Sequence, residues 1–293
     1  MDDFTLVGIR PASAPVSAKK APWYKGKPIL PLLILGAIAL GCLLCDTFVT
    51  KEPGYMDLTA CNFAPSAAHL FGTDTMGRDI FSMIWSGGRL SLLIGLLATL
   101  LSTAIAVFLG SLSGCAGEKL DAFLMRANEI FLSIPNLLLI VLLQALLGTA
   151  SAWSLSVVIG LTSWMSIAKV VRTEVRVLRS AEYVQAARCM GGSFLHVLLT
   201  HLAPNFLPSI LFMVIMNVRG AILAESTLSF LGLGLPLEVV SWGSMLSLSE
   251  KALLTGSWWI IMIPGLFLVV TLLSLTDIGN AVRKNLGRRD QIL

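Results

Sequence analysis

Residues 90–117 read LSLLIGLLATLLSTAIAVFLGSLSGCAG, and none of these 28 side chains is charged. A helix rises 1.5 Å per residue, so it needs roughly 20 apolar residues to cross the hydrocarbon core of a bilayer. The stretch is therefore long enough for one membrane span. It predicts that the chain is embedded in a membrane.

The composition of the whole chain supports this prediction. Of 293 residues, 56% are hydrophobic and 13% are charged, and the mean hydropathy is +0.83. A soluble protein of this length needs more polar surface. The net charge of +4 comes without interleaved basic and aromatic residues, so we expect a lipid bilayer and no nucleic acid as partner.

Other uncharged runs predict five further spans. The segment Lys27–Asp46 encloses one, which starts near Pro31. Glu129–Lys169 encloses 39 uncharged residues, too many for one crossing, and the GTAS turn at 148–151 divides them into a hairpin. The segments 205–232 and Lys251–Asp277 supply the last two. The predicted fold is all-α, a polytopic membrane protein with six transmembrane helices.

The distribution of lysine and arginine predicts the orientation of these spans. With the N-terminus inside, four such residues (Lys51, Arg78, Arg89 and Lys251) fall outside and Arg219 falls within a span. Cytoplasmic segments carry the excess of basic residues, so both termini are expected in the cytoplasm. The inner set is Arg10, Lys19, Lys20, Lys25, Lys27, Lys119, Arg126, Lys169, Arg172, Arg176, Arg179, Arg188, Arg283, Lys284, Arg288 and Arg289.

The spans and their orientation divide the chain into five parts. Both ends are cytoplasmic, and the first is rich in Pro, Ala and Lys, a composition typical of disorder. The parts are a disordered tail at 1–27, a first transmembrane helix at 28–50, an external loop with an amphipathic segment at 51–89, a five-helix core at 90–284 with a cytoplasmic loop at 180–205, and a tail at 285–293.

Several kinds of chemistry are not expected of this chain. No lysine is followed by Ser or Thr, so there is no Walker A phosphate loop. Cys42 and Cys45 lie within a predicted span without a second ligand pair, which favours packing over a metal site. We expect neither an enzyme nor a bound cofactor. An ion-driven secondary transporter stays an alternative, although only Glu225 provides an acidic group of the kind it would need.

The loop at 180–205 reads SAEYVQAARCMGGSFLHVLLTHLAPN and predicts two short helices. Gly191 and Gly192 break the first helix, and Ser193 is suited to cap the second. Pro204 is expected to end the second helix before Asn205 opens the next span. One apolar stripe is predicted for each helix: Tyr183, Ala186, Ala187 and Met190, then Phe194, Val197, Leu198 and His201.

These two helices allow two interpretations. They could lie on the membrane surface, or they could form a knob that enters the groove of a partner protein. Small residues suit close approach by a protein better than burial in lipid, where bulky apolar side chains gain more.

Four ordered stretches of the sequence resemble ABC-transporter permeases of the binding-protein-dependent import class, C-type permeases of the dipeptide/oligopeptide/nickel branch. The similarity covers about residues 69 to 284. Gln185 departs from it, because the family usually has Glu there. The stretches are EYVQAARCMGGSFLHVLLTHLAPN from Glu182, HLFGTDTMGRDIFSMIWSGGRLSLLIG from His69, LMRANEIFLSIPNLLLI from Leu124, and ILAESTLSFLGLGLP followed by SWGSML from Ile222.

The resemblance implies a set of partners and a role for the loop. A second permease subunit would form a heterodimer with this chain, two ATPase subunits would hold ATP and Mg²⁺, and an extracytoplasmic binding protein would deliver the substrate. The 180–205 loop, here called the coupling loop, would insert into an ATPase cleft. Its expected contact residues are Glu182, Tyr183, Gln185, Ala186, Ala187, Arg188, Gly191, Ser193, His201 and Pro204.

Two further groups of polar residues are candidates for function. A charge within a span costs roughly 2.5–3.5 kcal/mol on insertion scales, so Arg219 and Glu225, with Asn217 nearby, are expected to line the pathway or face the second subunit. Asp74, Arg78 and Asp79 precede a span on the outer side. A gate or docking contact is possible for them, but we favour a membrane-surface helix capped by Asp74, with Arg78 and Asp79 solvated.

The resemblance also sets the expected substrate and location. The chain is predicted to import di- or oligopeptides, with nickel or a metal chelate as the alternative, across a bacterial or archaeal plasma membrane. No His, Cys or Met cluster is evident along the predicted spans, which favours peptides over a bare metal ion.

Overall fold

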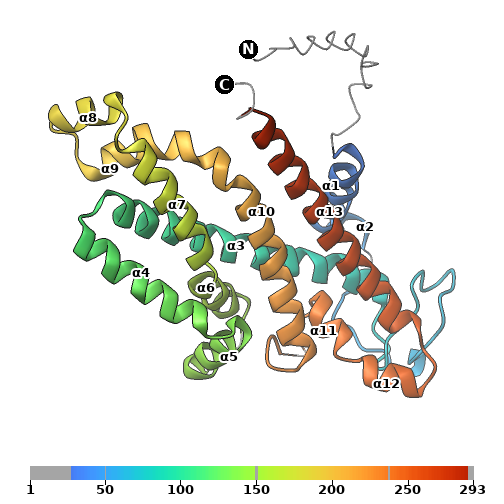
Figure 1. The fold of residues 1–293 in the computed structure, drawn as a ribbon. Coiled ribbons are helices and arrows are strands. Elements are labelled where there is room, and N and C mark those ends of the chain that lie inside the picture. Colours follow the sequence, from blue (N-terminus) through green and yellow to red (C-terminus); the bar gives the residue numbers. More distant parts are fainter. Residues whose placement is uncertain (1–27, 50, 149–150, 237, 290–293) are drawn as a thin grey trace, which may run out of the picture.

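The computed structural model describes residues 28–49, 51–148, 151–236 and 238–289, which form helices joined by turns (Figure 1). Among these residues there is no strand beyond an isolated bridge between Thr73 and Asp79. The all-α prediction is confirmed. The tail expected at 1–27 and the end of the tail expected at 285–293 lie outside the described residues.

The helices differ greatly in length, from single turns to spans of 36 residues. They are α1 (Ile29–Leu43), α2 (Cys45–Phe48), η1 (Leu58–Ala60), α3 (Ile80–Cys115), α4 (Glu118–Ser133), α5 (Asn136–Leu147), α6 (Ala152–Thr162), α7 (Met165–Leu178), α8 (Glu182–Cys189), α9 (Phe194–Val197), the π-helix η2 (Leu198–Leu202), α10 (Ala203–Phe230), α11 (Trp242–Leu246), α12 (Ser249–Leu254) and α13 (Trp259–Arg289).

Three helical segments are long and apolar enough to cross a membrane on their own: α3, the continuous run Phe194–Phe230, and α13 as far as Asn285. Two bent pairs meet the same test, α4 with α5 at 93° and α6 with α7 at 46°. The apolar helix α1 is shorter, at 15 residues. The chain is therefore a multi-pass helical membrane protein, while the count of six spans stays a prediction.

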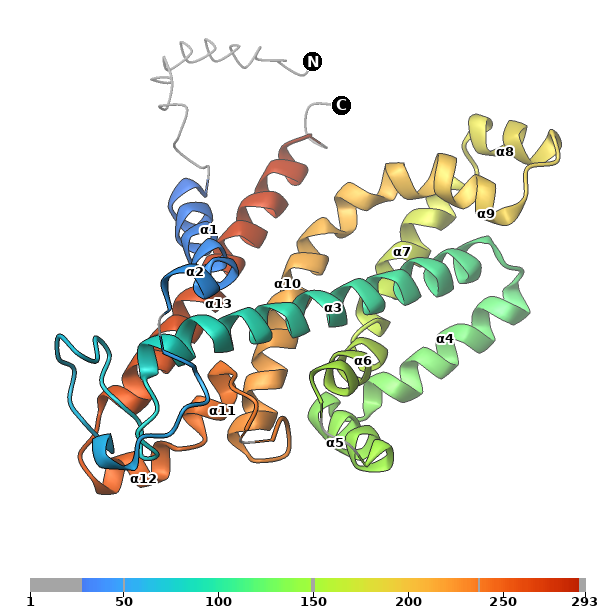
Figure 2. The ribbon, with the colours of Figure 1, turned by 180° about the vertical axis from the view of Figure 1, so that it is seen from behind.

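Helix α3 is the centre of the fold, and α6, α7 and α10 pack against it (Figure 2). Glycines permit this close packing. A Cβ added to Gly95 would lie 2.5 Å from the Ile222 side chain of α10, and one added to Gly110 would lie 2.7 Å from the Ala168 carbonyl oxygen of α7. Small residues let helix backbones approach each other in membrane proteins.

Helix α3 begins at Ile80, inside the range expected for the external loop. Arg89 does not end it, because its guanidinium lies on an exposed face and pairs with Asp46 at 2.8 Å. A single charge with a partner is compatible with a continuing helix. Uncharged runs therefore underestimate the length of a helix whose ends are polar.

The structure describes both ends of the predicted hairpin turn, whose residues 149 and 150 lie outside the described residues. Gly148 ends α5 with a φ of +68°, and the Ser151 side chain caps α6. The 93° bend between α4 and α5 was not predicted from the sequence. Ile134 is extended ahead of Pro135, as expected for a residue that precedes proline.

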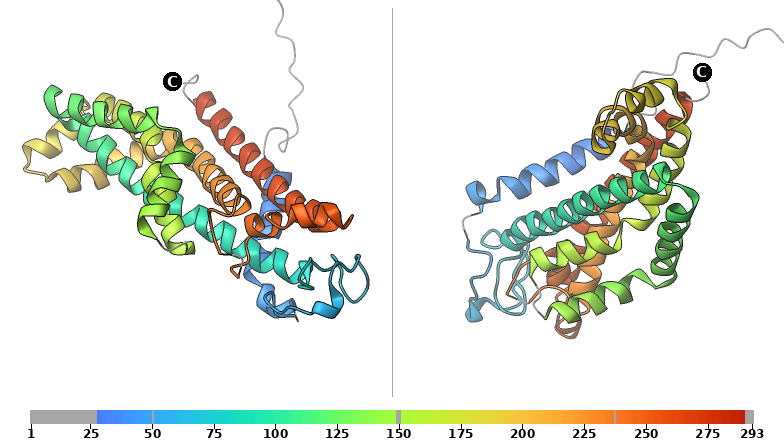
Figure 3. Two further views of the ribbon diagram at one scale, coloured as in Figure 1. Left: turned by 90° about the horizontal axis from the view of Figure 1, so that it is seen from below. Right: turned by 90° about the vertical axis from the view of Figure 1, so that its left-hand side faces the viewer.

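The helices place their ends at two opposite sides of the bundle. In Figure 1 the start of α1, the end of α13 and the helices α8 and α9 lie at the top, whereas α5, α11 and α12 lie at the bottom. Figure 3 shows α8 and α9 projecting beyond the other helices. The coupling loop thus lies on the same side as both ends of the described helical bundle.

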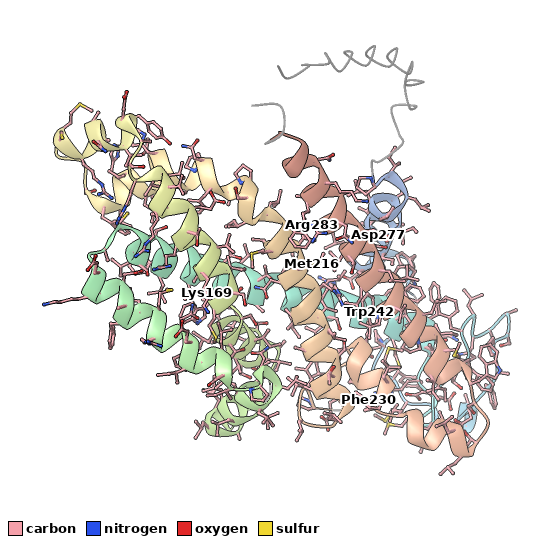
Figure 4. All side chains as sticks on the ribbon, in the orientation of Figure 1. Lys169, Met216, Phe230, Trp242, Asp277 and Arg283 are labelled. Atoms are coloured by element: carbon pink, nitrogen blue, oxygen red, sulfur yellow. The ribbon has the colours of Figure 1, made fainter. Side chains whose placement is uncertain are left out.

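Helix α11 packs into the bundle on the side opposite to the coupling loop. Trp242 is fully buried, and its indole Nε1 donates to the Ile84 carbonyl oxygen of α3 at 3.0 Å (Figure 4). Gly243 packs on Ser226 of α10, since an added Cβ would lie 2.6 Å from the Ser226 Cα. The segment after α10 is therefore packed into the bundle.

Candidate functional site

The first helix of the coupling loop ends as the sequence predicts. Gly191 has a φ of +84°, and its N–H donates to the Arg188 carbonyl oxygen at 3.0 Å. The Gly192 N–H donates to the Ala187 carbonyl oxygen, also at 3.0 Å. This pair of bonds is the Schellman motif, in which a left-handed glycine satisfies the last carbonyls of a helix.

The second helix begins as predicted but does not end as predicted. Ser193 caps α9, its Oγ accepting from the His196 N–H at 3.3 Å. The prediction that Pro204 ends this helix is wrong, because α9 continues through η2 into α10. The wider π-turn accommodates a proline that lacks an N–H and whose ring would clash with the preceding turn. Asn205 Nδ2 donates to the His201 carbonyl oxygen at 2.6 Å, another contact in this widened turn.

The coupling loop is held to the bundle by an apolar core. Val184, Val197, Leu198 and Leu202 are buried, in one cluster with Val171 and Val175 of α7. The loop therefore packs against α7 and α10 through buried apolar side chains.

The stripe predicted for α8 is wrong at one position. Ala187 is only 6% exposed, because it shares the buried face of α8 with Val184, three residues earlier. Tyr183, Ala186 and Met190 are exposed, so these three form the apolar stripe that remains open to a partner. Ala187 packs in the apolar core that attaches α8 to the bundle and does not face a partner.

The polar residues of the coupling loop are divided between its surface and its attachment. Glu182 is exposed, and Gln185 Nε2 donates to the Ser180 carbonyl oxygen at 3.1 Å. Arg188 Nη2 donates to the Cys115 sulfur at the end of α3, at 3.0 Å. The His201 ring lies 6.2 Å from that of Tyr183, centroid to centroid. An exposed apolar stripe on a firmly held loop is suited to docking in a groove.

A cavity of about 640 Å³ lies where the two bent helix pairs meet α10. The ends of α4 and α6 and the starts of α5 and α7 all contribute to it, and none of its lining side chains is charged. The lining residues are Phe131, Leu132, Ser133, Ile134, Pro135, Asn136, Leu139, Thr162, Ser163, Met165, Ser166, Ile167, Phe212, Met213, Met216, Asn217 and Gly220.

The structure brings one of the three candidate pathway residues to this cavity. Asn217 lines it and donates from Nδ2 to Ser102 Oγ at 2.5 Å. Arg219 is partly buried on α10 and makes no hydrogen bond or ion pair within the described part of the chain. Glu225 is fully buried and does not line the cavity. Its carboxylate accepts from Ser91 and Ser229, each at 3.0 Å.

The favoured interpretation of the outer acidic segment is wrong. Asp74 is 1% exposed and caps no helix; it accepts from the Arg78 backbone N–H at 2.8 Å and from Arg78 Nε at 2.7 Å. Asp79 is 8% exposed and caps α3 through the Ser82 N–H. Gly77 makes this tight turn possible, since a Cβ there would overlap the Asp57 carbonyl oxygen. Asp79 also pairs with His69 at 2.8 Å and lines a small pocket with Lys51 and His69, so the gate or docking role stays a prediction.

The described residues contain no group of three or more His, Cys, Asp or Glu side chains that could hold a metal ion. Cys42 and Cys45 are buried at 1% and 3% exposure, which agrees with a packing role. Met165, Met213 and Met216, in contrast, meet at the cavity although two different helices carry them. The expectation that the spans hold no Met cluster is therefore wrong at this cavity, because Met165 is distant in sequence from Met213 and Met216 and only the fold brings them together.

The fold and the projecting loop define a multi-pass membrane subunit of a transport system. Residues 106–289 match the family described as binding-protein-dependent transport system inner membrane component. The chain belongs to this family, whose members are membrane permease subunits and not enzymes.

Similarity to individual proteins extends over most of the chain. A putative peptide permease protein of Brucella suis biovar 1 is 36% identical, over 90% of this chain and 87% of the relative. The dipeptide transport system permease protein DppC of Bacillus subtilis is 35% identical, over 87% and 78%. The oligopeptide transport system permease protein OppC of the same organism is 34% identical, over 86% and 82%.

Proposed function

We propose that this chain is one permease half of an ATP-driven importer of di- or oligopeptides. The observation that carries the proposal is the coupling loop, an apolar knob fixed to α7 at one side of a membrane-spanning bundle. The names of its relatives supply the substrate class. An ion-driven carrier does not need a loop that docks on an ATPase. Membership in a binding-protein-dependent family also argues against an ion-driven carrier.

ATP hydrolysis in this proposal takes place on two separate ATPase subunits that bind ATP and Mg²⁺. Tyr183, Ala186 and Met190 would enter an ATPase cleft, with Glu182 on the same exposed surface. Gly191 sets the direction of the chain between the two short helices. The coupling loop and both termini would therefore lie in the cytoplasm.

The uncharged cavity would form this chain's side of the translocation pathway. Hydroxyl and amide side chains such as Ser133, Asn136 and Asn217 can hydrogen-bond to a peptide backbone, and the apolar remainder tolerates varied side chains. A hydrated nickel ion would find no carboxylate or imidazole in this wall. The thioethers of Met165, Met213 and Met216 are soft ligands that suit other metals, so peptides fit better than the nickel ion.

A second permease subunit would complete the pathway. Arg219 supports this part of the proposal, because a guanidinium within a span needs a partner and has none within the described residues. A carboxylate of the second subunit would satisfy it. The binding protein would dock at the opposite side, near α11 and α12.

Reconstitution tests the proposal directly. The chain is co-expressed with its transport-system subunits, purified in detergent and placed in proteoliposomes with ATP inside or outside. We expect two ATPases and a second permease to co-purify, and labelled peptide uptake to require both ATP on the loop side and the binding protein. Uptake by the chain alone, driven by an ion gradient, would contradict the proposal.

A further inference from the structure

Helix α4 is attached to the rest of the bundle in an unusual way. Its only buried side chains are Asp121 and Asn128, and both are polar. They are seven residues apart, which is two helical turns, so they lie on one face. Helices normally pack through an apolar stripe, and α4 lacks a buried one.

Asp121 is the stronger of the two attachments. Its Oδ1 accepts from Arg172 Nε at 2.5 Å and from Ser113 Oγ at 2.5 Å, and its Oδ2 accepts from Arg172 Nη2 at 2.6 Å and from Arg176 Nη2 at 2.5 Å. Two parallel bonds between a guanidinium and a carboxylate fix both distance and orientation. One carboxylate thus joins α3, α4 and α7.

Asn128 repeats the attachment two turns further along. Its Nδ2 donates to the Met165 carbonyl oxygen, in the first residue of α7, at 3.2 Å. Met165 and Arg172 are also seven residues apart, so the two contacts are in register along both helices. They hold α4 beside α7 through polar contacts at the only buried positions of α4.

Both helices reach the cavity, but only α7 also carries the coupling loop. The first residues of α7 line the cavity, and the loop packs on Val171 and Val175 further along the same helix. Helix α4 ends at the bend before Pro135, in the wall of the 640 Å³ cavity. The contacts of Asp121 and Asn128 therefore connect the helix that carries the coupling loop to the helix that ends in the cavity wall.

We propose that Asp121 and Asn128 are positioning residues that make α4 follow α7, so that movement of the coupling loop changes the cavity wall at the α4–α5 bend. Directional hydrogen bonds at two points seven residues apart fix both the rotation of α4 and its position beside α7. This inference rests on the proposed function, because it needs a motor that moves the loop.

The test compares three variants in the complete reconstituted importer: Asp121→Asn, Asn128→Leu and the control Glu129→Gln. Glu129 lies on the same helix in an exposed pair with Arg126. Peptide uptake and ATP hydrolysis are measured together. We expect the peptide carried per ATP to fall at least about fivefold in the first two variants, the lower end of ordinary coupling between sites. ATP hydrolysis and the control should stay at the wild-type level.

Each outcome decides the inference. An unchanged ratio of peptide to ATP in an assembled Asp121→Asn or Asn128→Leu complex overturns it. If one variant fails to assemble, the ratio in the other decides; if neither assembles, the contacts only hold the fold together and the transmitting role is rejected. If the wild-type complex itself takes up no peptide with ATP, the proposed function has failed instead.

Discussion

Single residues of this permease act mainly through backbone geometry and burial. Gly191 is needed for its left-handed φ, and the space around it is open. Glu225 and Asp74 are charged residues that form part of the packed interior. The sequence identified all three as special, but it could not distinguish an exposed charge from a buried one that has partners.

Gly191→Asp is expected to abolish peptide uptake while the permease still inserts and assembles. A residue with a Cβ costs about 1–2 kcal/mol in the left-handed region, which redirects the chain after α8. Uptake in vesicles and membrane insertion are measured together. The matched control is Gly148→Asp, since Gly148 has a similar φ of +68° and equally open space, but lies in the α5–α6 turn. Full uptake by the Gly191 variant would refute the coupling role.

Asp74→Ala is expected to destabilise the protein, because it leaves the Arg78 guanidinium buried without its carboxylate. Breaking a buried ion pair on one side costs about 3–5 kcal/mol. Thermal unfolding in detergent should show a clearly lowered midpoint. Asp46→Ala serves as the control, since its pair with Arg89 is exposed, and should leave the midpoint unchanged. Equal midpoints for both variants would show that the outer turn adds no stability.

Whole elements were predictable where the signal is local. The helix end at Gly148, the helix start after Ser151 and the break at Gly191 each depend on residues next to each other, and the structure shows all three. The continuity of α9 with α10 was missed, because a π-turn can absorb a proline that a regular α-helix would not tolerate at that position. The cavity was missed as well. It requires two bent helix pairs to meet α10, and no local pattern encodes that meeting.

At the element scale, Glu225 joins α3 to α10 through buried serines, which leads to a prediction on stability. Glu225→Leu is expected to lower the unfolding midpoint in detergent more than Glu225→Gln. The amide keeps one oxygen acceptor for one serine and offers its NH2 as a donor to the hydroxyl oxygen of the other, whereas leucine leaves buried hydroxyls that each cost about 1–3 kcal/mol if unsatisfied.

Peptide selectivity should stay unchanged in both Glu225 variants, because the side chain does not reach the cavity. Leu223→Ala, at an exposed position of the same helix, controls for general effects on α10. Changed selectivity with a normal midpoint would instead assign Glu225 to the pathway.

At the scale of the whole molecule, charge distribution and architecture agree. Positive residues predict both termini on the inner side, and the structure places the start of α1 and the end of α13 on the side of the coupling loop (Figure 1). Length and hydropathy predicted a multi-pass helical protein, but not the bends within the α4–α5 and α6–α7 pairs. Packing around α3 could not be predicted, because it depends on which glycines of one helix meet which side chains of another.

Native cysteines offer a test of this topology. Cys189 is exposed in the coupling loop, and Cys61 is partly exposed in the segment before α3. A membrane-impermeant maleimide added to intact cells is expected to label Cys61 and to leave Cys189 unlabelled until the membrane is permeabilised. If the reagent labels Cys189, or a cysteine placed at position 185, from outside, the coupling loop lies outside the cell and the proposed orientation is wrong.

The neutral wall of the cavity has a consequence for how the importer chooses its cargo. A surface without fixed charge neither attracts nor repels an ionised side chain over long distances. Acidic, basic and neutral peptides would therefore pass this half of the route at similar rates. Discrimination among them would have to happen earlier, when the cargo is captured and handed over.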